Sequence, residues 1–249
     1  MKNILIIGMG EVGKSIEKLY DENTYNILNI DADSPNEVIK VPLSYKVDVM
    51  NICFSYSKKF TSYVKDYILF YKPKLTIIHS TVPFLTTDII YNATKAEIVH
   101  SPVIGVHPKL TESIQTFEKI IAGYTKTAVK LAREHFSTLG IKTVVYDSPE
   151  ETELAKMLST TYYGLCIRYM QDVHKLCEKF TLNFDQIYTK TNKLYNKGYS
   201  DMNMSFVNRP VLKYMGEKIK GHCVRENSKL LINAKMIKKF AKIVFKEDK

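Results

Sequence analysis

Three glycines near the start of the chain are spaced to hold a dinucleotide. The turn consists of Gly8, Met9, Gly10, Glu11, Val12 and Gly13, a G-x-G-x-x-G pattern. In this pattern the first glycine makes a tight turn, the second lets a pyrophosphate approach the backbone, and the third lets a helix pack closely on a strand. An acidic residue about 20 positions further on takes the ribose hydroxyls, and Asp31 stands at that place.

The turn is a specific signal only when a strand precedes it and a helix follows it. Residues 3–7 form a short apolar run typical of a buried parallel strand. Ile16 and Leu19 after the turn suit the start of a helix, and residues 25–30 predict a second strand that ends at Asp31. The helix N-terminus offers free N–H groups to phosphates. Asp31 would repel a 2′-phosphate and no arginine follows it directly, so we predict NAD rather than NADP.

Further apolar runs alternate with helical patterns over the first 147 residues. The predicted strands are 47–54, 75–79, 97–100, 119–123 and 142–146. The predicted helices between them are 60–71, 86–94 and 127–139. This alternation predicts an α/β fold with a Rossmann-type, doubly wound and mostly parallel sheet.

The pattern changes at Asp147. From Pro149 a helical pattern continues to about Lys179, with Ser148 as the predicted N-cap and Glu151 at the capping-box spacing. Residues 185–194 and 226–245 also have helical patterns, separated by a polar stretch near 198–203. We therefore predict a dinucleotide-binding domain over 1–147 and an all-helical domain, built on one long helix, over 148–249.

The composition is that of an ordinary globular protein, with 249 residues and 45% hydrophobic side chains. No apolar run is long enough for a membrane helix, and the first strand begins too early for a signal peptide. The four cysteines do not form a disulfide framework, so we predict a cytoplasmic protein. The net charge of +10 comes without a nucleic-acid motif, which favours anionic small molecules over nucleic acid and membranes.

Three further motifs make the chain resemble a known family. Residues 80–87 read STVPFLTT, residues 153–162 read ELAKMLSTTY, and residues 221–223 read GHC. They resemble the S-T-V-P-x-G-T-T, A-E-x-x-K-x-x-x-N-T-Y and G-G-H-C motifs of the nucleotide-sugar dehydrogenases, the UDP-glucose and GDP-mannose 6-dehydrogenase family. The chain is also similar to the related two-domain 3-hydroxyacid and 6-phosphogluconate dehydrogenases. Leu85 replaces the family's glycine in the first motif.

The resemblance implies roles for residues of these motifs. Ser80 and Thr81 would contact the cofactor, and Lys156 would hydrogen-bond the reacting hydroxyl and stabilise charge on its oxygen. Thr160 stands where the family has asparagine, so it offers a single hydroxyl donor. Cys223 would attack the aldehyde made in the first oxidation, and the thiohemiacetal would give up a second hydride.

Other positions depart from the family pattern. Arg225 and Asn227 stand where the family has proline and aspartate after the cysteine. The family's third domain, which helps to bind the nucleotide, has no counterpart in this sequence.

The segment after the 97–100 strand is a candidate substrate loop. It consists of Ser101, Pro102, Val103, Ile104 and Gly105. It resembles the loop with which hydroxyacid dehydrogenases touch the substrate carboxylate, which implies that Ser101, Pro102, Val103 and Gly105 line the substrate site. His100 and His107 lie nearby, and we interpret both as polar contacts rather than catalysts. We predict no metal site.

The sequence leaves three functions open. The first is an NAD-dependent dehydrogenase of the nucleotide-sugar type, reduced in size, that oxidises an alcohol and continues to the acid through Cys223. The second is a two-electron 3-hydroxyacid dehydrogenase in which Cys223 is idle. The third is a dinucleotide-binding protein that has lost turnover, an alternative suggested by Thr160, Arg225 and Asn227.

The long helix also bears on assembly. Its apolar side chains, from Leu154 to Leu176, cover more than one face. A helix of that kind must be buried on more than one side. We therefore predict a homodimer formed through this helix.

Overall fold

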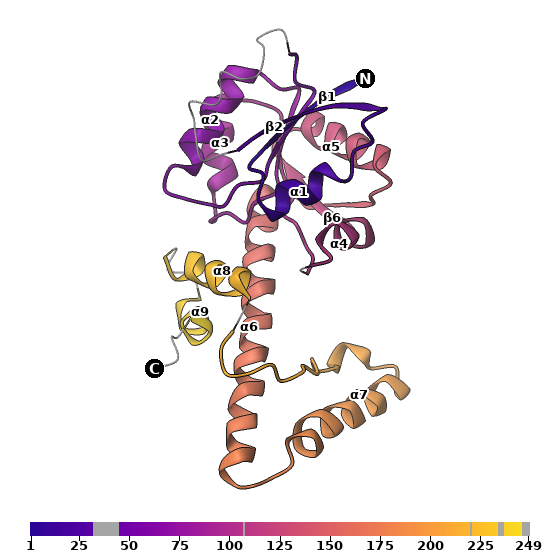
Figure 1. Ribbon diagram of the computed structural model, residues 1–249, viewed down its shortest axis with the longest axis vertical. Coiled ribbons are helices and arrows are strands. Elements are labelled where there is room, and N and C mark those ends of the chain that lie inside the picture. Colours follow the sequence, from indigo (N-terminus) through magenta and orange to yellow (C-terminus); the bar gives the residue numbers. More distant parts are fainter. Residues whose placement is uncertain (32–44, 107, 220, 234–236, 246–249) are drawn as a thin grey trace. The chain divides into compact units, whose positions relative to one another are not determined.

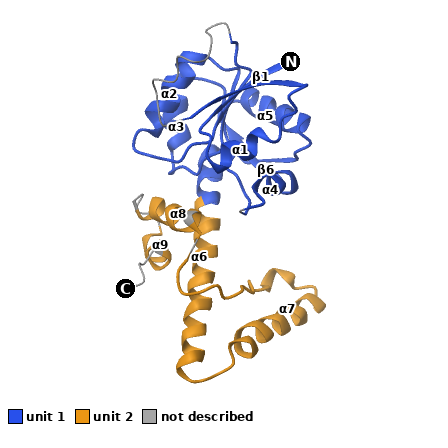
Figure 2. Ribbon diagram, viewed as in Figure 1, with its two compact units in different colours: residues 1–156 blue, residues 157–249 orange. Residues whose placement is uncertain are grey.

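The computed structural model describes residues 1–31, 45–106, 108–219, 221–233 and 237–245 (Figure 1). Within this part the chain forms two compact units, residues 1–156 and 157–249 (Figure 2).

Unit 1 is built on one seven-stranded sheet in the order β2-β1-β3-β4-β5-β6-β7. The strands are β1 (Lys2–Ile7), β2 (Tyr25–Ile30), β3 (Val49–Ile52), β4 (Leu75–Ile78), β5 (Ile98–His100), β6 (Lys119–Gly123) and β7 (Thr143–Val145). All neighbouring strands are parallel except β5 and β6. The predicted α/β, Rossmann-type and mostly parallel sheet is therefore confirmed.

Helices lie on both faces of this sheet (Figure 1). They are α1 (Glu11–Glu17), α2 (Phe60–Tyr71), α3 (Thr86–Thr94), α4 (Leu110–Thr116) and α5 (Lys126–Thr138). Side chains of β1 alternate between the two faces: Ile4 and Ile6 pack with Phe136 of α5, while Leu5 and Ile7 pack with Phe60 of α2. Because both faces are covered, the strands have the continuous apolar runs from which they were predicted.

A row of polar side chains runs through the core of unit 1. Asn51 of β3 accepts at its Oδ1 from His79 Nε2 at 2.9 Å, and its Nδ2 donates to Tyr20 Oη at 3.0 Å. Tyr20 Oη in turn lies 2.9 Å from His135 Nε2. Burial lowers the pKa of His135 to about 4 and that of His79 further, so both rings are neutral near pH 7. These hydrogen bonds offset part of the cost of burying the polar side chains, although the Nδ1 atoms of His79 and His135 are buried without a hydrogen-bond partner among the described residues.

Helix α6 (Pro149–Lys179) begins in unit 1 and ends in unit 2. Its predicted start at Pro149 is confirmed, and the Glu151 carboxylate accepts from the Asp147 amide at 3.0 Å. The other segments of unit 2 are η2 (Asp185–Lys190), α7 (Thr191–Asp201), η3 (Ser205–Val207), α8 (His222–Asn233) and α9 (Lys238–Phe245).

Two helical predictions for unit 2 were wrong in detail. The helix predicted over 185–194 is a π-helical turn, η2, followed by α7, which continues through Gly198 to Asp201. The helix predicted over 226–245 is two helices, and the first of them already begins at His222. The break before α9 has a local cause, because Ile237 has φ 33°, outside the helical region.

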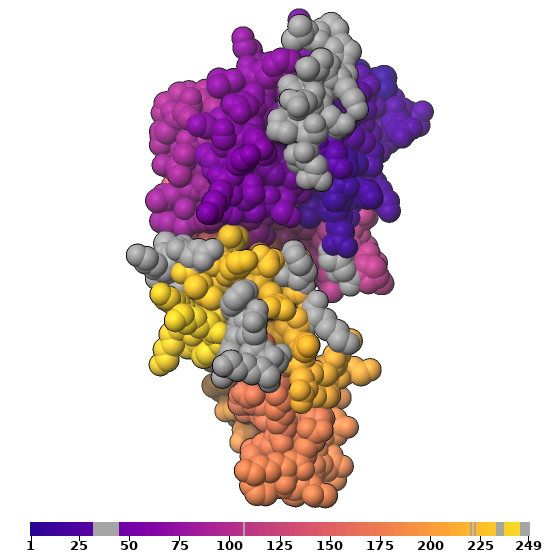
Figure 3. Space-filling view, turned by 60° about the vertical axis from the view of Figure 1, so that its left-hand side comes forward, coloured from indigo at the N-terminus to yellow at the C-terminus, as the bar shows by residue number. Residues whose placement is uncertain are grey.

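Helices α8 and α9 pack against α6 through a contact that needs a glycine. A Cβ at Gly164 would lie 2.5 Å from Val244 Cγ1 and 2.7 Å from Val224 Cγ1. Val224 and Val244 are buried together with Ile219. Figure 3 shows α8 and α9 in yellow at the surface of unit 2.

Candidate functional site

The glycine turn has the geometry that a bound pyrophosphate requires. Gly8 has φ +94°, and a Cβ there would lie 2.6 Å from Phe54 N. A Cβ at Gly13 would lie 2.0 Å from the Gly8 carbonyl oxygen, so α1 can approach β1 only with a glycine at that position. At Gly10, in contrast, a Cβ would have no atom within 4 Å. Gly8 and Gly13 are therefore required by close backbone contacts. Gly10 leaves open space at the turn through which a pyrophosphate could approach.

Asp31 lies next to this turn. The Gly8 amide donates to the Ile30 carbonyl at 2.8 Å, which ties the turn to the last residue of β2. Asp31 follows directly and is exposed, so its carboxylate is available to ribose hydroxyls. Because β1 and β2 are parallel, both the turn and Asp31 lie at the carboxyl edge of the sheet, where ligands bind in open α/β folds.

Ser80 lies at the end of β4, at the same edge, and its hydroxyl is already in use. Ser80 Oγ donates to the Phe54 carbonyl at 2.6 Å, and Ser80 is buried. Thr81 beside it is half-buried. In the described structure Ser80 thus ties the end of β4 to the end of β3, while Thr81 remains the more accessible of the two.

Glu153 is a buried carboxylate that the sequence singled out only as part of a motif. Its side chain is 0% exposed and accepts from the Leu85 amide at 2.7 Å, the Thr87 amide at 2.8 Å and Thr87 Oγ1 at 2.7 Å. Burial raises the pKa of Glu153 to about 7, although these hydrogen bonds lower it. Glu153 therefore binds the start of α6 to the N-terminal end of α3.

The same contact explains the departure at Leu85. Leu85 has φ 69° and ψ 10°, in the left-handed region. A glycine adopts this conformation without the steric cost that a Cβ imposes, and glycine is the residue that the family motif has there. The Leu85 side chain itself is 41% exposed, so it contributes little burial in return.

Lys156, the predicted catalytic residue, lies on α6 and is half-buried. Burial lowers the pKa of a second lysine, Lys119 of β6, and the ammonium group of Lys156 adds to this shift. Two ammonium groups thus lie in the same region of unit 1, close to the predicted substrate loop. No sequence motif singles out Lys119, because a lysine in a predicted strand more often lies at the edge of the sheet, exposed to solvent.

The predicted substrate loop, residues 101–105, is largely packed within unit 1. Ser101, Pro102 and Val103 are buried, and only Ile104 and Gly105 are exposed. A Cβ at Gly105 would lie 2.6 Å from Ser113 Cβ, so this glycine allows α4 to pack on the loop. The hydroxyl of Ser101 is buried and has no hydrogen-bond partner among the described residues.

The two predicted histidines lie beside this loop in the sequence. His100 is buried, with Nδ1 2.7 Å from Thr152 Oγ1 and Nε2 3.2 Å from the Ser80 carbonyl oxygen. It therefore connects the sheet to the first turn of α6 as a polar contact. His107 lies outside the described residues.

Unit 2 brings together two positions at which the sequence departs from the family pattern. Asn227 Nδ2 donates to Thr160 Oγ1 at 3.2 Å. Cys223 is exposed and lies in the first turn of α8, one helical turn before Asn227. The residues that replace the family's asparagine and aspartate are thus in direct contact with each other, one on α6 and one on α8.

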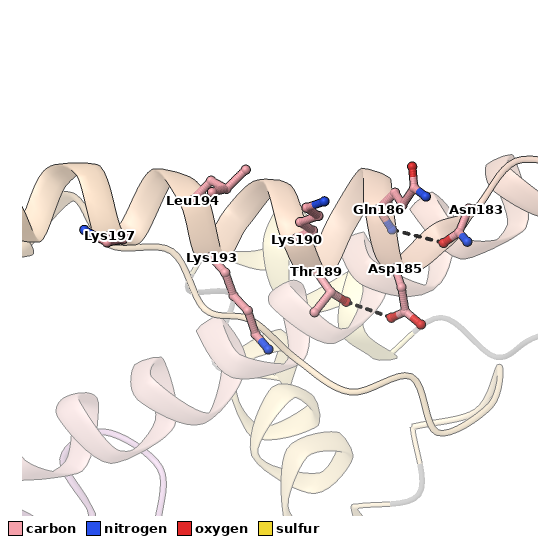
Figure 4. A pocket seen from close by; sticks show the side chains of 8 residues that line it. All are labelled: Asn183, Asp185, Gln186, Thr189, Lys190, Lys193, Leu194 and Lys197. Atoms are coloured by element: carbon pink, nitrogen blue, oxygen red, sulfur yellow. Dashed lines mark hydrogen bonds between the residues drawn. The ribbon is translucent and has the colours of Figure 1, made fainter.

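Two hollows of the described surface lie elsewhere in unit 2. One has a volume of about 500 Å³ and is lined by Asn183, Asp185, Gln186, Thr189, Lys190, Lys193, Leu194 and Lys197. Figure 4 shows these side chains along the helical segment, where Thr189 Oγ1 donates to Asp185 Oδ1 at 3.1 Å. None of the predicted site residues lines this hollow.

The described part of the chain has neither a metal-binding cluster nor a membrane-spanning helix. Within the described part of the chain, no group of three or more His, Cys, Asp or Glu side chains is placed to hold a metal ion. No described helix is both long and apolar enough to cross a membrane.

The sheet, the glycine turn and the long helix after it form a Rossmann-type α/β fold that continues into a helical region. No family model matches the chain. It is 23% identical over 226 residues to UDP-N-acetyl-D-mannosamine dehydrogenase from Methanococcus vannielii, a match that covers 74% of this chain and 53% of the relative. The chain thus spans about half the length of that relative. The chain is thus similar to a nucleotide-sugar dehydrogenase, in agreement with the resemblance of its motifs.

Solved structures agree with this fold. A UDP-glucose dehydrogenase from Pyrobaculum islandicum aligns with a TM-score of 0.72 at 14% identity, over 98% of this chain and 67% of that one. A 3-hydroxyisobutyrate dehydrogenase from Mycobacterium tuberculosis also aligns with a TM-score of 0.72, at 12% identity, over 98% of this chain and 91% of that one.

Proposed function

We propose that this chain is an NAD-dependent dehydrogenase that oxidises an alcohol group on an anionic small molecule of the nucleotide-sugar class. The observation that carries the proposal is the glycine turn. A Cβ at Gly8 or Gly13 would overlap neighbouring backbone atoms, whereas the space around Gly10 is open to a ligand. Bound NAD would supply the hydride acceptor. The turn would hold its pyrophosphate, and Asp31 would hold its adenosine ribose.

The preference for NAD over NADP rests on charge. The Asp31 carboxylate is exposed at the end of β2, where it would accept from ribose hydroxyls and repel a 2′-phosphate. A titration with both cofactors tests this, and an Asp31→Asn variant serves as the matched control. We expect NAD to bind more tightly to the wild type and the variant to lose part of that preference. NADP that binds the wild type at least as tightly as NAD would contradict the assignment.

Lys156 is the residue that we propose to act on the substrate. Its side chain is half-buried, and a lysine in such a place can hydrogen-bond a reacting hydroxyl and stabilise negative charge on its oxygen. A cofactor-reduction screen over nucleotide sugars and small hydroxyacids identifies the substrate. Lys156→Met should then abolish turnover while NAD still binds, whereas Lys142→Met, at an exposed position, should change neither.

A two-electron reaction is the second candidate, and the contact between Thr160 and Asn227 favours it. Asn227 is a neutral amide whose Nδ2 is bound to Thr160 Oγ1, so it cannot take a proton from water as a carboxylate would. Cys223→Ser separates the two reactions. An enzyme that uses the thiol should stall after the first hydride, whereas a two-electron enzyme should keep its rate. Cys166→Ser, at another cysteine of unit 2, is the control.

Loss of turnover remains the third candidate. Tight NAD binding without reduction on any substrate of the screen would support a dinucleotide-binding protein in place of an enzyme. The substitutions at Thr160 and Asn227 motivate this alternative.

We also propose a homodimer formed through α6. In unit 2 this helix exposes large side chains, with Tyr162 58%, Tyr169 65% and Leu176 54% accessible. An exposed apolar helix face of this kind is typical of a protein–protein contact. Light scattering at micromolar concentration tests it. A mass near 28.7 kDa that does not change with concentration would rule out the dimer.

A further inference from the structure

The amine of Lys119 is buried in unit 1, and no carboxylate among the described residues pairs with it. Lys119 is only 4% exposed. Its Nζ donates to the Ser101 carbonyl at 2.9 Å and to the Pro102 carbonyl at 3.3 Å. It also lies 5.5 Å from the centroid of the Phe136 ring. A buried ammonium group is costly unless it is paired, so a lysine held only by carbonyl oxygens and a ring calls for an explanation.

The position of Lys119 follows from the one antiparallel pair in the sheet. β6 runs antiparallel to β5, with His100 opposite Ala122. The first residue of β6 therefore lies beyond the carboxyl end of β5, where residues 101 and 102 leave the sheet. The Lys119 side chain meets the loop at its root, before the exposed Ile104 and Gly105.

We propose that Lys119 is a positioning residue whose protonated amine holds the Ser101 and Pro102 carbonyls and thereby fixes the loop of residues 101–105. The loop's own backbone bonds to the sheet are few: the Ser101 amide donates to the Ile78 carbonyl at 2.9 Å and the Val103 amide to the His79 carbonyl at 3.2 Å. Two charge-assisted bonds from one amine are a large addition to these. That the loop touches substrate rests on the proposed function, but its fixation by Lys119 does not.

The strength of the hydrogen bonds from Lys119 Nζ to the Ser101 and Pro102 carbonyls depends on whether the amine is protonated. Burial lowers the pKa of Lys119 to about 7; the Cys53 thiol opposes this shift, and the Lys156 ammonium adds to it. The imidazoles of His79 and His100 also interact with Lys119, and both are neutral because burial lowers their pKa. A neutral amine has lost one donor and its charge, so its bonds to the carbonyls weaken as the pH rises through neutrality.

Amide hydrogen exchange of Ser101 and Val103, read on the full chain without cofactor or substrate, tests this proposal. After correction for the intrinsic rate, we expect wild-type protection to fall by at least about tenfold between about pH 6 and about pH 8.5, because the protonated fraction of an amine with a pKa of about 7 falls from roughly nine tenths to a few per cent over this range. Lys119→Met should show low protection at both values. Lys142→Met, the same substitution at an exposed residue, should behave as the wild type.

Each outcome decides the proposal. Equal protection in the wild type at both pH values, or wild-type protection in Lys119→Met at about pH 6, would overturn it. If Lys119→Met does not fold, Lys119→Arg replaces it, because a permanently charged side chain should keep the loop protected at both pH values. Protection in Lys119→Arg that falls with pH as in the wild type would also overturn the proposal. Since no ligand is present, a failure here is distinguishable from a failure of the proposed dehydrogenase function.

Discussion

Replacement of Glu153 by glutamine should change the free energy of unfolding by an amount that depends on pH, and the sign of that dependence follows from the structure. Burial raises the pKa of this carboxyl from its ordinary 4.5 to about 7. Between these two values the folded chain keeps a proton that the unfolded chain has lost. The contribution of Glu153 to stability is therefore fully present below pH 4.5, and it is lost as the pH rises through 7.

The magnitude follows from the size of the shift. One pKa unit corresponds to about 1.4 kcal/mol, so the rise to about 7 corresponds to roughly 3 kcal/mol of pH-dependent stability. Glutamine does not titrate. We expect Glu153→Gln to be less stable than the wild type near pH 4.5, because its amide cannot accept from both Leu85 and Thr87. Between about pH 4.5 and pH 8 the difference should shift by about 3 kcal/mol in favour of the variant.

Urea unfolding followed by circular dichroism at a series of pH values measures this difference. Glu150→Gln is the matched control, one turn earlier on α6. Burial raises the pKa of Glu150, but the hydrogen bonds that its carboxylate accepts from Tyr124 Oη, at 2.7 Å, from its own backbone amide and from the Ser148 side chain together outweigh burial, and the net shift is downward. Relative to Glu150→Gln, the wild type should therefore gain stability as the pH rises. A difference between wild type and Glu153→Gln that stays constant with pH would refute the reasoning.

Three further substitutions have expected effects on the free energy of unfolding, each measured by urea unfolding. Leu85→Gly should stabilise by about 0.5 kcal/mol, because relief at φ 69° exceeds the entropy that glycine adds to the unfolded chain; a loss of stability would contradict this. Gly164→Ala should cost about 2 kcal/mol, because its Cβ would overlap valines of α8 and α9; a neutral effect would show that these helices move aside freely. Tyr20→Phe should cost about 2 kcal/mol, because it leaves Asn51 and His135 without the shared hydroxyl; an unchanged stability would mean that water replaces it.

The sheet and the long helix could be predicted because local signals there agree with the fold. Residues 4–7 are buried on both faces of β1, and a strand that is buried on both faces has a continuous apolar run in its sequence. Pro149 marks the start of α6, and no later proline interrupts that helix. Helix α4 (Leu110–Thr116) was not predicted. Only Leu110, Ser113 and Ile114 are buried in its short span, so the helical periodicity of apolar residues is weak there.

The parts of the site that could not be predicted depend on contacts far apart in the sequence. Lys119 reaches the loop only because β6 is antiparallel to β5, a pairing that no local pattern encodes. Glu153 accepts from residues 66 and 68 positions away. The contact between Thr160 and Asn227 spans 67 positions, so each substitution could be noted in the sequence but their pairing could not.

Binding of NAD to the glycine turn is the measurement that tests the central claim most directly. Titration calorimetry on the wild type should show binding, and Gly10→Ala should weaken it by at least about tenfold, or about 1.4 kcal/mol, because the new Cβ fills the approach that is open in the wild type. Gly10 has φ −70°, so alanine fits the backbone there and the variant should fold. Gly198→Ala, at another glycine with open space around it, should bind NAD as the wild type does. A wild type that binds no dinucleotide, or a Gly10→Ala variant that binds it equally well, would contradict the account.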